Sequence, residues 1–341
     1  VTLFLKLKEF DHTYQEMNKG DWKINLLPRP SLFVRLFNII VGKFGASFLI
    51  TLIEKTLVNL AIMKSLKRMK DAELSGKVPL ILCDAGARKV MKERLANYAE
   101  GMRASVALQS FAKVSLYTGS LQLLANHAGL LQLGMDARKE VVRNPVFIVS
   151  MPRTATTALH RTMATDTSRW NTFDLADMVK PLPPISRSDH KSRAKLVKKV
   201  RRAVVNPIDL FYPGWFECLE TMNSQVIDEA DEDLGLYNSG LGILYQDTLL
   251  HLQPKKNIEA MALESAEMAT YRYAWLDMIM RIYQKLEPDN NKTWLMKDPK
   301  HTAFLPQLIQ QFPDARFVFI HRVPGDILAS MAKLFMCFSC V

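Results

Sequence analysis

The chain reads Val146-Phe-Ile-Val-Ser-Met-Pro-Arg-Thr-Ala-Thr-Thr157, and this stretch decides its fold. The first four residues form a short apolar, β-branched run of the kind that a buried parallel strand needs. Met151–Thr157 follows as a tight loop, and Ala158–Ala164 has the character of a helix. A strand, a tight loop and a helix in this order predict one α/β unit.

A second α/β passage lies near the end of the chain. Two short apolar strands alternate there with two helices, which predicts a P-loop-like parallel sheet with helices on its faces. We expect a mostly helical region over residues 1–140, an α/β core over 141–341, and a helical insertion on the acceptor side over 180–292. The expected elements of the second passage are strand Thr293–Met296, helix Thr302–Gln311, strand Phe317–Ile320 and helix Asp326–Phe335.

The composition is that of a globular protein, because 48% of the 341 residues are hydrophobic and 23% are charged. A net charge of +11 attracts polyanions, nucleotides and acidic membranes without choosing among them. The basic runs Lys64–Lys70 and Lys191–Arg202 lack interleaved aromatic residues, so we expect solvated helix faces and no nucleic-acid partner. No zinc spacing is present, and the cysteines are expected to be ordinary thiols or small buried apolar residues: Cys83, Cys218, Cys337 and Cys340.

Two apolar stretches bear on membrane contact. Ser31–Ile53 contains Arg35 and Lys43, so its uncharged part is too short to cross a bilayer. Together with the basic cluster that follows, residues 31–70 predict a peripheral contact with a membrane surface. Val114–Met135 carries several polar residues and is expected to form a buried helix pair. No secretory signal is visible at Val1, so we expect a cytoplasmic protein with this membrane association.

The loop after the first strand has the chemistry of a phosphate cradle. Backbone N–H groups at a helix start favour an anion, and Arg153 adds a fixed positive charge. The hydroxyl groups of Thr154, Thr156 and Thr157 add donors. The Walker pattern with its lysine occurs nowhere in the chain, which argues against an ATPase or GTPase. The alternative interpretation is a helix start at which threonine side chains cap the backbone.

The second passage adds another cation at the end of a strand. Arg322 follows the predicted strand Phe317–Ile320, and ligands of open α/β sheets bind at the carboxyl ends of strands. Ser330 lies on the following helix, where its hydroxyl can reach a group held by Arg322. The alternative is that Arg322 pairs with a core carboxylate such as Asp326.

These segments, taken in order, resemble the sulfotransferases that use 3′-phosphoadenosine-5′-phosphosulfate. The loop is similar to their Pro-Lys/Arg-Ser/Thr-Gly-Thr-Thr pattern, and Arg322 and Ser330 keep the spacing of their 3′-phosphate motif. Trp294-Leu-Met-Lys-Asp-Pro-Lys-His301 and Phe312-Pro-Asp-Ala-Arg316 resemble the Lys-Ser-Pro-x-His and Phe-Pro-Asp-Ala-Arg segments of one broad branch. Ala230-Asp-Glu-Asp233 resembles its acidic segment more loosely. The likeness is spread over residues 110–335.

The resemblance implies in-line transfer of a sulfuryl group to a hydroxyl or amine acceptor, without a metal. The acceptor is expected to be a small molecule, a lipid or a carbohydrate. The residues that the resemblance assigns to the 5′-phosphosulfate are Arg153, Thr154, Ala155, Thr156 and Thr157. Those that it assigns to the 3′-phosphate are Arg322 and Ser330.

Catalysis requires cations at the leaving phosphate and a base for the acceptor's proton. Arg153 and Lys297 are the expected cations. His301 is the expected base, because it occupies the matching position and histidine is the side-chain type whose charge changes near neutral pH. A buried or helix-capping structural role is the alternative for His301. Asp231 and Glu232 are further candidates for the base or for the acceptor pocket, or else form an exposed acidic helix start.

Some positions depart from the family pattern. Ala155 stands where the family usually has glycine, Ala158 where some relatives have a stacking tryptophan, and Val323 where Asp or Asn is common. If residue 155 needs a positive φ, alanine there costs about 1 kcal/mol or more. Residues 331–341 end soon after the 3′-phosphate helix, which predicts a truncated chain. The alternative function is therefore a degenerate relative that binds nucleotide, membrane or a partner without turnover.

Overall fold

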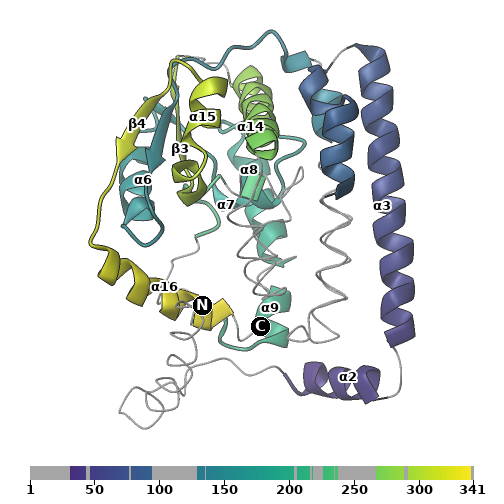
Figure 1. Cartoon of the computed structure of the whole chain (residues 1–341). Helices are drawn as coiled ribbons and strands as arrows, with labels where there is room; N and C mark the ends of the chain where they lie inside the picture. The colour runs from purple at the N-terminus through teal and green to yellow at the C-terminus, as the bar shows by residue number, and fades with distance from the viewer. Residues whose placement is uncertain are drawn as a thin grey trace, which may run out of the picture.

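The computed structural model describes residues 31–43, 47–76, 78–93, 129–134, 136–202, 206–215, 217, 226–233, 235–236, 266–287 and 291–338. Within them lies a four-stranded sheet in the order β2-β3-β1-β4, with every pairing parallel (Figure 1). The predicted P-loop-like parallel sheet with flanking helices is thus confirmed. The strands are β1 Val146–Val149, β2 Trp170–Asn171, β3 Thr293–Lys297 and β4 Arg316–Phe319.

Strand β1 is central, between β3 and β4, and all four of its residues are buried. Phe147 lies opposite Met296 on one side and Phe317 on the other. Strand β4 begins one residue earlier than predicted, because the Arg316 N–H donates to the Pro145 carbonyl at 2.8 Å and so extends the ladder. The apolar run of β1 is therefore explained by burial on both faces.

Successive side chains of the strands enter two different cores, as the two-residue period of a strand requires. Val146, Ile148 and Leu295 pack against α6 on one face. Phe147 and Met296 point to the other face, into the large core that includes α14 and α15. The helix bounds are α6 Thr156–Ala164, α7 Leu175–Val179, α8 His190–Val200, α9 Asn206–Phe211, α14 Ala266–Leu286, α15 Leu305–Gln311 and α16 Pro324–Phe338; the 3-10 helix η4 spans Pro299–Thr302.

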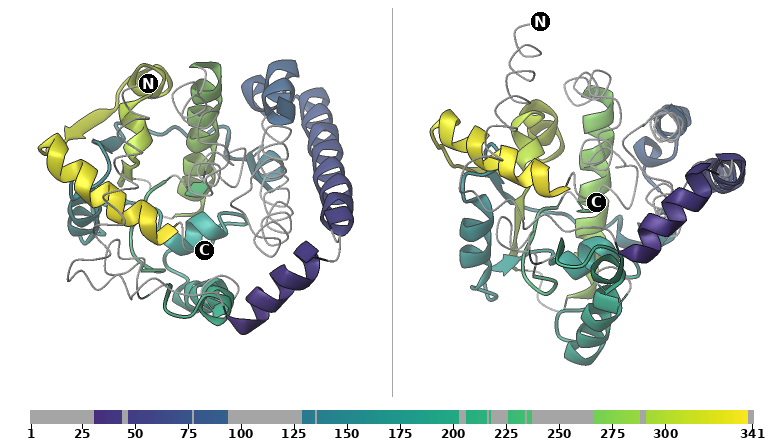
Figure 2. Two further views of the ribbon diagram at one scale, coloured as in Figure 1. Left: turned by 60° about the horizontal axis from the view of Figure 1, so that its bottom comes forward. Right: turned by 90° about the horizontal axis from the view of Figure 1, so that it is seen from below.

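The N-terminal part is helical where it is described, with α2 over Leu32–Lys43 and α3 over Ser47–Ser75. Helix α3 stands on the side of α14 that is away from the sheet (Figures 1 and 2). Met69 of α3 and Cys83 are fully buried in the core that α14 also lines, which confirms the expectation for this cysteine. Residues 85–93 are also helical, as expected for this region.

Several predictions fall outside the described residues. They concern most of the predicted helix pair Val114–Met135, Cys218 and Cys340, and the side chain of Cys337. The boundary at residue 140 and the truncation at the end of the chain stay predictions. None of the described helices combines the length and the apolar character that crossing a bilayer requires.

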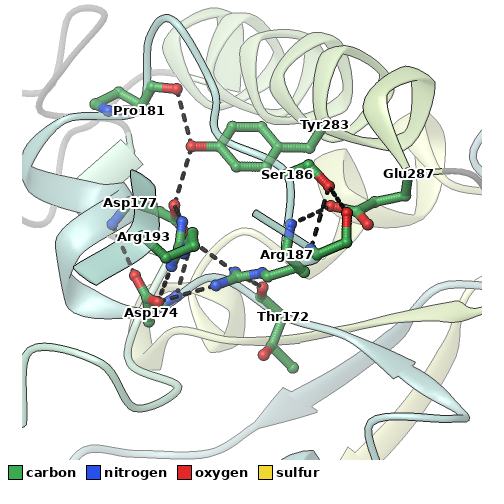
Figure 3. Close-up of polar contacts among 10 residues, drawn as sticks. Thr172, Asp174, Asp177, Pro181, Ser186, Arg187, Arg193, Tyr283 and Glu287 are labelled. Atoms are coloured by element: carbon green, nitrogen blue, oxygen red, sulfur yellow. Dashed lines mark hydrogen bonds and ion pairs between the residues drawn. The ribbon is translucent and has the colours of Figure 1, made fainter. Parts of the chain in front are cut away.

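Two buried carboxylates fix α7 and α8 to α14 (Figure 3). Asp174 and Asp177 form the capping box of α7, and Arg187 and Arg193 pair with both of them. The Tyr283 hydroxyl of α14 donates to Asp177 Oδ1 at 3.3 Å or to the Pro181 carbonyl at 2.9 Å. Burial raises the pKa of Asp174, and the neighbouring Asp177 adds to that rise. Removing one member of such a network leaves a buried charge without its partner, so the network holds this region in place.

Candidate active site

The loop between β1 and α6 is held by its own hydroxyl groups. Ser150 Oγ donates to the Ile320 carbonyl at 2.6 Å and lies 2.7 Å from Thr154 Oγ1. Thr154 Oγ1 donates in turn to the Met151 carbonyl at 2.8 Å, and only 3% of the residue is exposed. Thr154 therefore shapes the loop from inside, whereas the half-buried Thr157 lies at the first turn of α6.

Two residues of this loop have a left-handed backbone. Arg153 has φ 67°, and Ala155, the N-cap residue of α6, has φ 65° and ψ 21°. The condition under which alanine at position 155 is costly, a positive φ, is therefore met. The alternative of a threonine cap is wrong, because the N-cap is an alanine and no side chain caps the helix. The exposed start of α6 therefore keeps its first-turn N–H groups without a capping side chain, which suits an anion.

The structure brings the two predicted phosphate-binding segments together. Arg153 Nε donates to Ser330 Oγ of α16 at 2.8 Å, and Arg322 Nη1 donates to the Arg153 carbonyl at 3.0 Å. Arg322 Nε also forms the alternative ion pair with Asp326, at 3.7 Å, but both side chains are exposed, so Asp326 is not a core carboxylate. Burial lowers the pKa of Arg153; the Glu232 carboxylate opposes that shift and the charge of Arg322 adds to it.

Lys297 is a third cation at the same edge of the sheet. It is the last residue of β3, and its side chain is completely buried. Its ammonium group donates to Thr157 Oγ1 at 3.1 Å and to Glu232 Oε1 at 2.9 Å. Lys297 thereby links the first turn of α6 to the acidic segment Ala230-Asp-Glu-Asp233.

The acidic segment is anchored on both sides of Glu232. The Asp231 N–H donates to the Phe173 carbonyl at 3.2 Å, and the Asp233 N–H donates to the Lys297 carbonyl at 3.1 Å. Arg161 of α6 donates to the Ala230 carbonyl at 3.2 Å. The Glu232 side chain is 25% exposed, so its carboxylate keeps access to solvent at the site.

His301 lies behind this segment and is completely buried. Its Nε2 is 3.1 Å from Asp233 Oδ2, and its Nδ1 is 3.1 Å from the Tyr273 hydroxyl. Phe147 packs edge-on against the ring, with centroids 5.1 Å apart. Because both ring nitrogens have partners inside the protein, this geometry favours the structural alternative for His301. Its catalytic role stays a prediction.

The sequence did not indicate Tyr273 as a partner of His301. The two residues are separated by 28 positions and lie on α14 and η4, so only the packing of these helices brings them together. No local pattern carries that information.

Among the described residues there is also no cluster of histidine, cysteine and carboxylate side chains able to hold a metal ion.

Known proteins match this chain in family and in fold. The model of the family described as the sulfotransferase family matches residues 145–338, which is more than half of the chain. The crystal structure of sulfotransferase STF9 from Mycobacterium avium is similar in fold, with a TM-score of 0.60 and 20% identity over 80% of this chain and 66% of that one.

A second solved structure has a lower score. Sulfotransferase STF1 from Mycobacterium tuberculosis H37Rv has a TM-score of 0.49 and 21% identity, over 79% of this chain and 70% of that chain. No curated protein sequence matches this chain significantly. The family match covers both α/β passages and the residues between them. This chain belongs to the sulfotransferase family.

Proposed function

We propose that this protein transfers the sulfuryl group of 3′-phosphoadenosine-5′-phosphosulfate to a hydroxyl or amine acceptor. The observation that carries the proposal is the contact between Arg153 and Ser330, which joins two anion-binding segments 177 residues apart. Three cations, Arg153, Lys297 and Arg322, gather around the uncapped start of α6. A donor with phosphate groups at both its 5′ and 3′ positions has the charge that such a site requires.

Each segment has its own part in binding the donor. The 5′-phosphosulfate is held by the backbone N–H groups that begin with Ala155, by Arg153, and by the hydroxyl groups of Thr156 and Thr157. Thr154 contributes by shaping the loop, since its hydroxyl is used internally. The 3′-phosphate is held by Arg322 and Ser330, and this group separates the donor from ATP.

The reaction is a displacement in line at sulfur. The acceptor oxygen or nitrogen forms the new bond to sulfur, and the bond from sulfur to the 5′-phosphate oxygen breaks, with its electron pair left on that oxygen. Arg153 and Lys297 stabilise the charge that develops on the leaving phosphate. The acceptor's proton passes to a carboxylate or imidazole base.

We assign that base to Glu232 in preference to His301. Glu232 is bonded to Lys297, which itself contacts Thr157 of the donor loop, and its carboxylate is partly exposed. His301 is buried behind it with both nitrogens occupied. The acceptor belongs to the hydroxyl- or amine-bearing small molecules, lipids or carbohydrates.

Calorimetric binding of 3′-phosphoadenosine-5′-phosphate, with AMP as the comparison ligand, tests the donor site. We expect micromolar binding that needs the 3′-phosphate and is lost in Arg322→Ala. Arg316→Ala is the matched control, because Arg316 is also exposed but lies at the opposite end of β4. Absence of binding by folded wild-type protein would refute the proposal.

The second candidate is a relative that binds the nucleotide without turnover. Alanine has a left-handed backbone at position 155, which is strained. This strain favours the second candidate, because it lies in the loop that would hold the donor's phosphosulfate for transfer. Binding of the nucleotide together with failure to transfer labelled sulfate to any compound of an acceptor panel would support this candidate.

A further inference from the structure

Helix α2 carries an exposed apolar face. Val34 is completely buried, whereas Leu32, Phe33 and Leu36 are 63%, 57% and 48% exposed. Positions 32, 33 and 36 lie within about 100° of each other around a helix, so the three side chains share one face. Single exposed apolar residues are common, but a contiguous group marks an interaction surface.

Helix α9 extends this face. The Ser31 N–H donates to the Phe211 carbonyl at 2.7 Å, and the rings of Phe33 and Phe211 are 5.8 Å apart. Leu210, next to Phe211, is 67% exposed. Two segments distant in sequence thus form one surface, the apolar platform, which consists of Leu32, Phe33, Leu36 and Leu210.

Exposed arginines flank, in the sequence, the two segments that form the apolar platform. Arg35 is exposed on α2, and Arg201 and Arg202 are exposed at the end of α8, a few residues before α9. None of these three arginines forms an ion pair within the described part of the chain. Helix α8 contains several lysines and no acidic residue. Exposed apolar side chains with arginine and lysine around them are typical of a surface that binds anionic lipid.

The cationic run near the middle of α3 is too far away to serve this surface. Lys64 lies 17 residues beyond Ser47, where α3 begins near α2. At 1.5 Å per residue this separation is about 26 Å along the helix axis. The predicted contact over residues 31–70 stays a prediction. The surface around the apolar platform keeps α2 from that range and takes further charge and apolar area from α8 and α9.

The apolar platform and the donor site lie at the same end of the molecule. Helices α2, α9 and α16 all lie at the lower end in Figure 1, and the view from below in Figure 2 shows them together. Helix α16 carries Ser330, whose hydroxyl accepts a hydrogen bond from Arg153 in the loop after β1. A partner surface that binds the apolar platform would therefore lie at the same end of the molecule as the proposed donor site.

We propose that the apolar platform, with Arg35, Arg201 and Arg202, docks this protein onto the surface of an anionic lipid bilayer. Insertion of the leucine and phenylalanine side chains removes apolar area from water, while the arginines bind lipid phosphates. A second copy of the chain is a poorer partner, because a two-fold interface would place two surfaces of the same positive charge against each other.

Flotation of the full chain with lipid vesicles tests this docking without nucleotide or acceptor, so its outcome is independent of the proposed function. We expect binding to phosphatidylcholine vesicles that contain phosphatidylserine, little binding to pure phosphatidylcholine, and release at high salt. The triple variant Leu32→Gln, Leu36→Gln, Leu210→Gln and the double variant Arg201→Gln, Arg202→Gln should each lower the partition coefficient roughly ten-fold.

Leu74→Gln is the matched control, because Leu74 is 77% exposed at the far end of α3. Circular dichroism of every variant establishes that it is folded. The docking is overturned if folded wild-type protein does not float with anionic vesicles, if the triple variant floats as well as the wild type, or if Leu74→Gln is equally impaired. A dimer in light scattering that the triple variant dissociates, without flotation, would assign the apolar platform to a second copy and also overturn it.

Discussion

Arg153 Nε donates a hydrogen bond of 2.8 Å to Ser330 Oγ, and this bond joins the loop after β1 to helix α16. A serine hydroxyl accepts from one group and donates to another at the same time. Ser330 can therefore hold the Arg153 guanidinium and donate to a 3′-phosphate oxygen of the donor. The two ends of the proposed nucleotide site are thus coupled through a single hydroxyl group.

Ser330→Ala should weaken the binding of 3′-phosphoadenosine-5′-phosphate by about 10- to 100-fold. The change removes a hydrogen bond to a charged phosphate and releases Arg153 from its partner, and such bonds are worth about 1.5–3 kcal/mol. Calorimetry measures the effect. Ser188→Ala, at an exposed serine whose hydroxyl group contacts only Ser186 Oγ in the described hydrogen bonds, should bind like the wild type. Equal affinity in Ser330→Ala would contradict the role of Ser330.

Ala155→Gly should raise the free energy of unfolding by about 1 kcal/mol. Ala155 has φ 65°, where a Cβ is unfavourable and glycine is not, although the greater freedom of glycine in the unfolded chain offsets part of the gain. Urea denaturation measures the difference. Ala158→Gly, on an exposed helical position three residues later, should instead destabilise by about 1 kcal/mol. If both variants changed the free energy of unfolding in the same direction, strain at residue 155 would be unimportant.

Glu232→Gln should lower kcat by at least about 100-fold while leaving nucleotide affinity nearly unchanged, because the amide cannot take the acceptor's proton but can still accept a hydrogen bond from Lys297. Transfer of labelled sulfate to an acceptor found by screening measures kcat. His301→Gln is the companion variant, with a folding control by circular dichroism. Full turnover in Glu232→Gln together with its loss in folded His301→Gln would return the role of base to His301.

His160 should make the protein less stable in mild acid. Burial and the charge of Lys297 lower the pKa of this histidine to about 4, below its ordinary value of 6.5. The unfolded chain therefore binds a proton that the folded chain does not bind, and stability falls as the pH drops from about 6.5 to about 4, by up to about 3 kcal/mol.

The variant His160→Gln isolates that contribution, because glutamine does not titrate and can still donate to the Leu295 carbonyl that His160 Nε2 contacts at 3.2 Å. Urea denaturation across this pH range should show a weaker loss of stability for the variant than for the wild type. Other titrating groups are common to both proteins and cancel in the comparison. If the free energy of unfolding falls with pH equally in the two proteins, His160 is not held in its neutral form by burial in the folded protein.

The local sequence was sufficient to predict strands β1, β3 and β4, the tight loop after β1 and the cations at the strand ends, whereas the two-residue strand β2 was not predicted. A fully buried strand requires a run such as Val146–Val149, and an anion-binding turn requires small residues before a helix, so both leave local patterns. The sequence also pointed to strain at Ala155, because alanine replaces a residue that tolerates positive φ. These features depend on the backbone and on neighbours within a few residues.

Only the tertiary structure decided which polar groups meet. Lys297 is between Thr157 and Glu232, residues 140 and 65 positions away, and His301 is enclosed by Asp233 and Tyr273 from two further segments. The pKa and the access of a side chain depend on these distant neighbours and on burial, which the packing of α14, β3 and α6 creates. The sequence by itself determined the chemistry available at the sheet edge, and the packing decided that the glutamate faces the site while the histidine lies behind it.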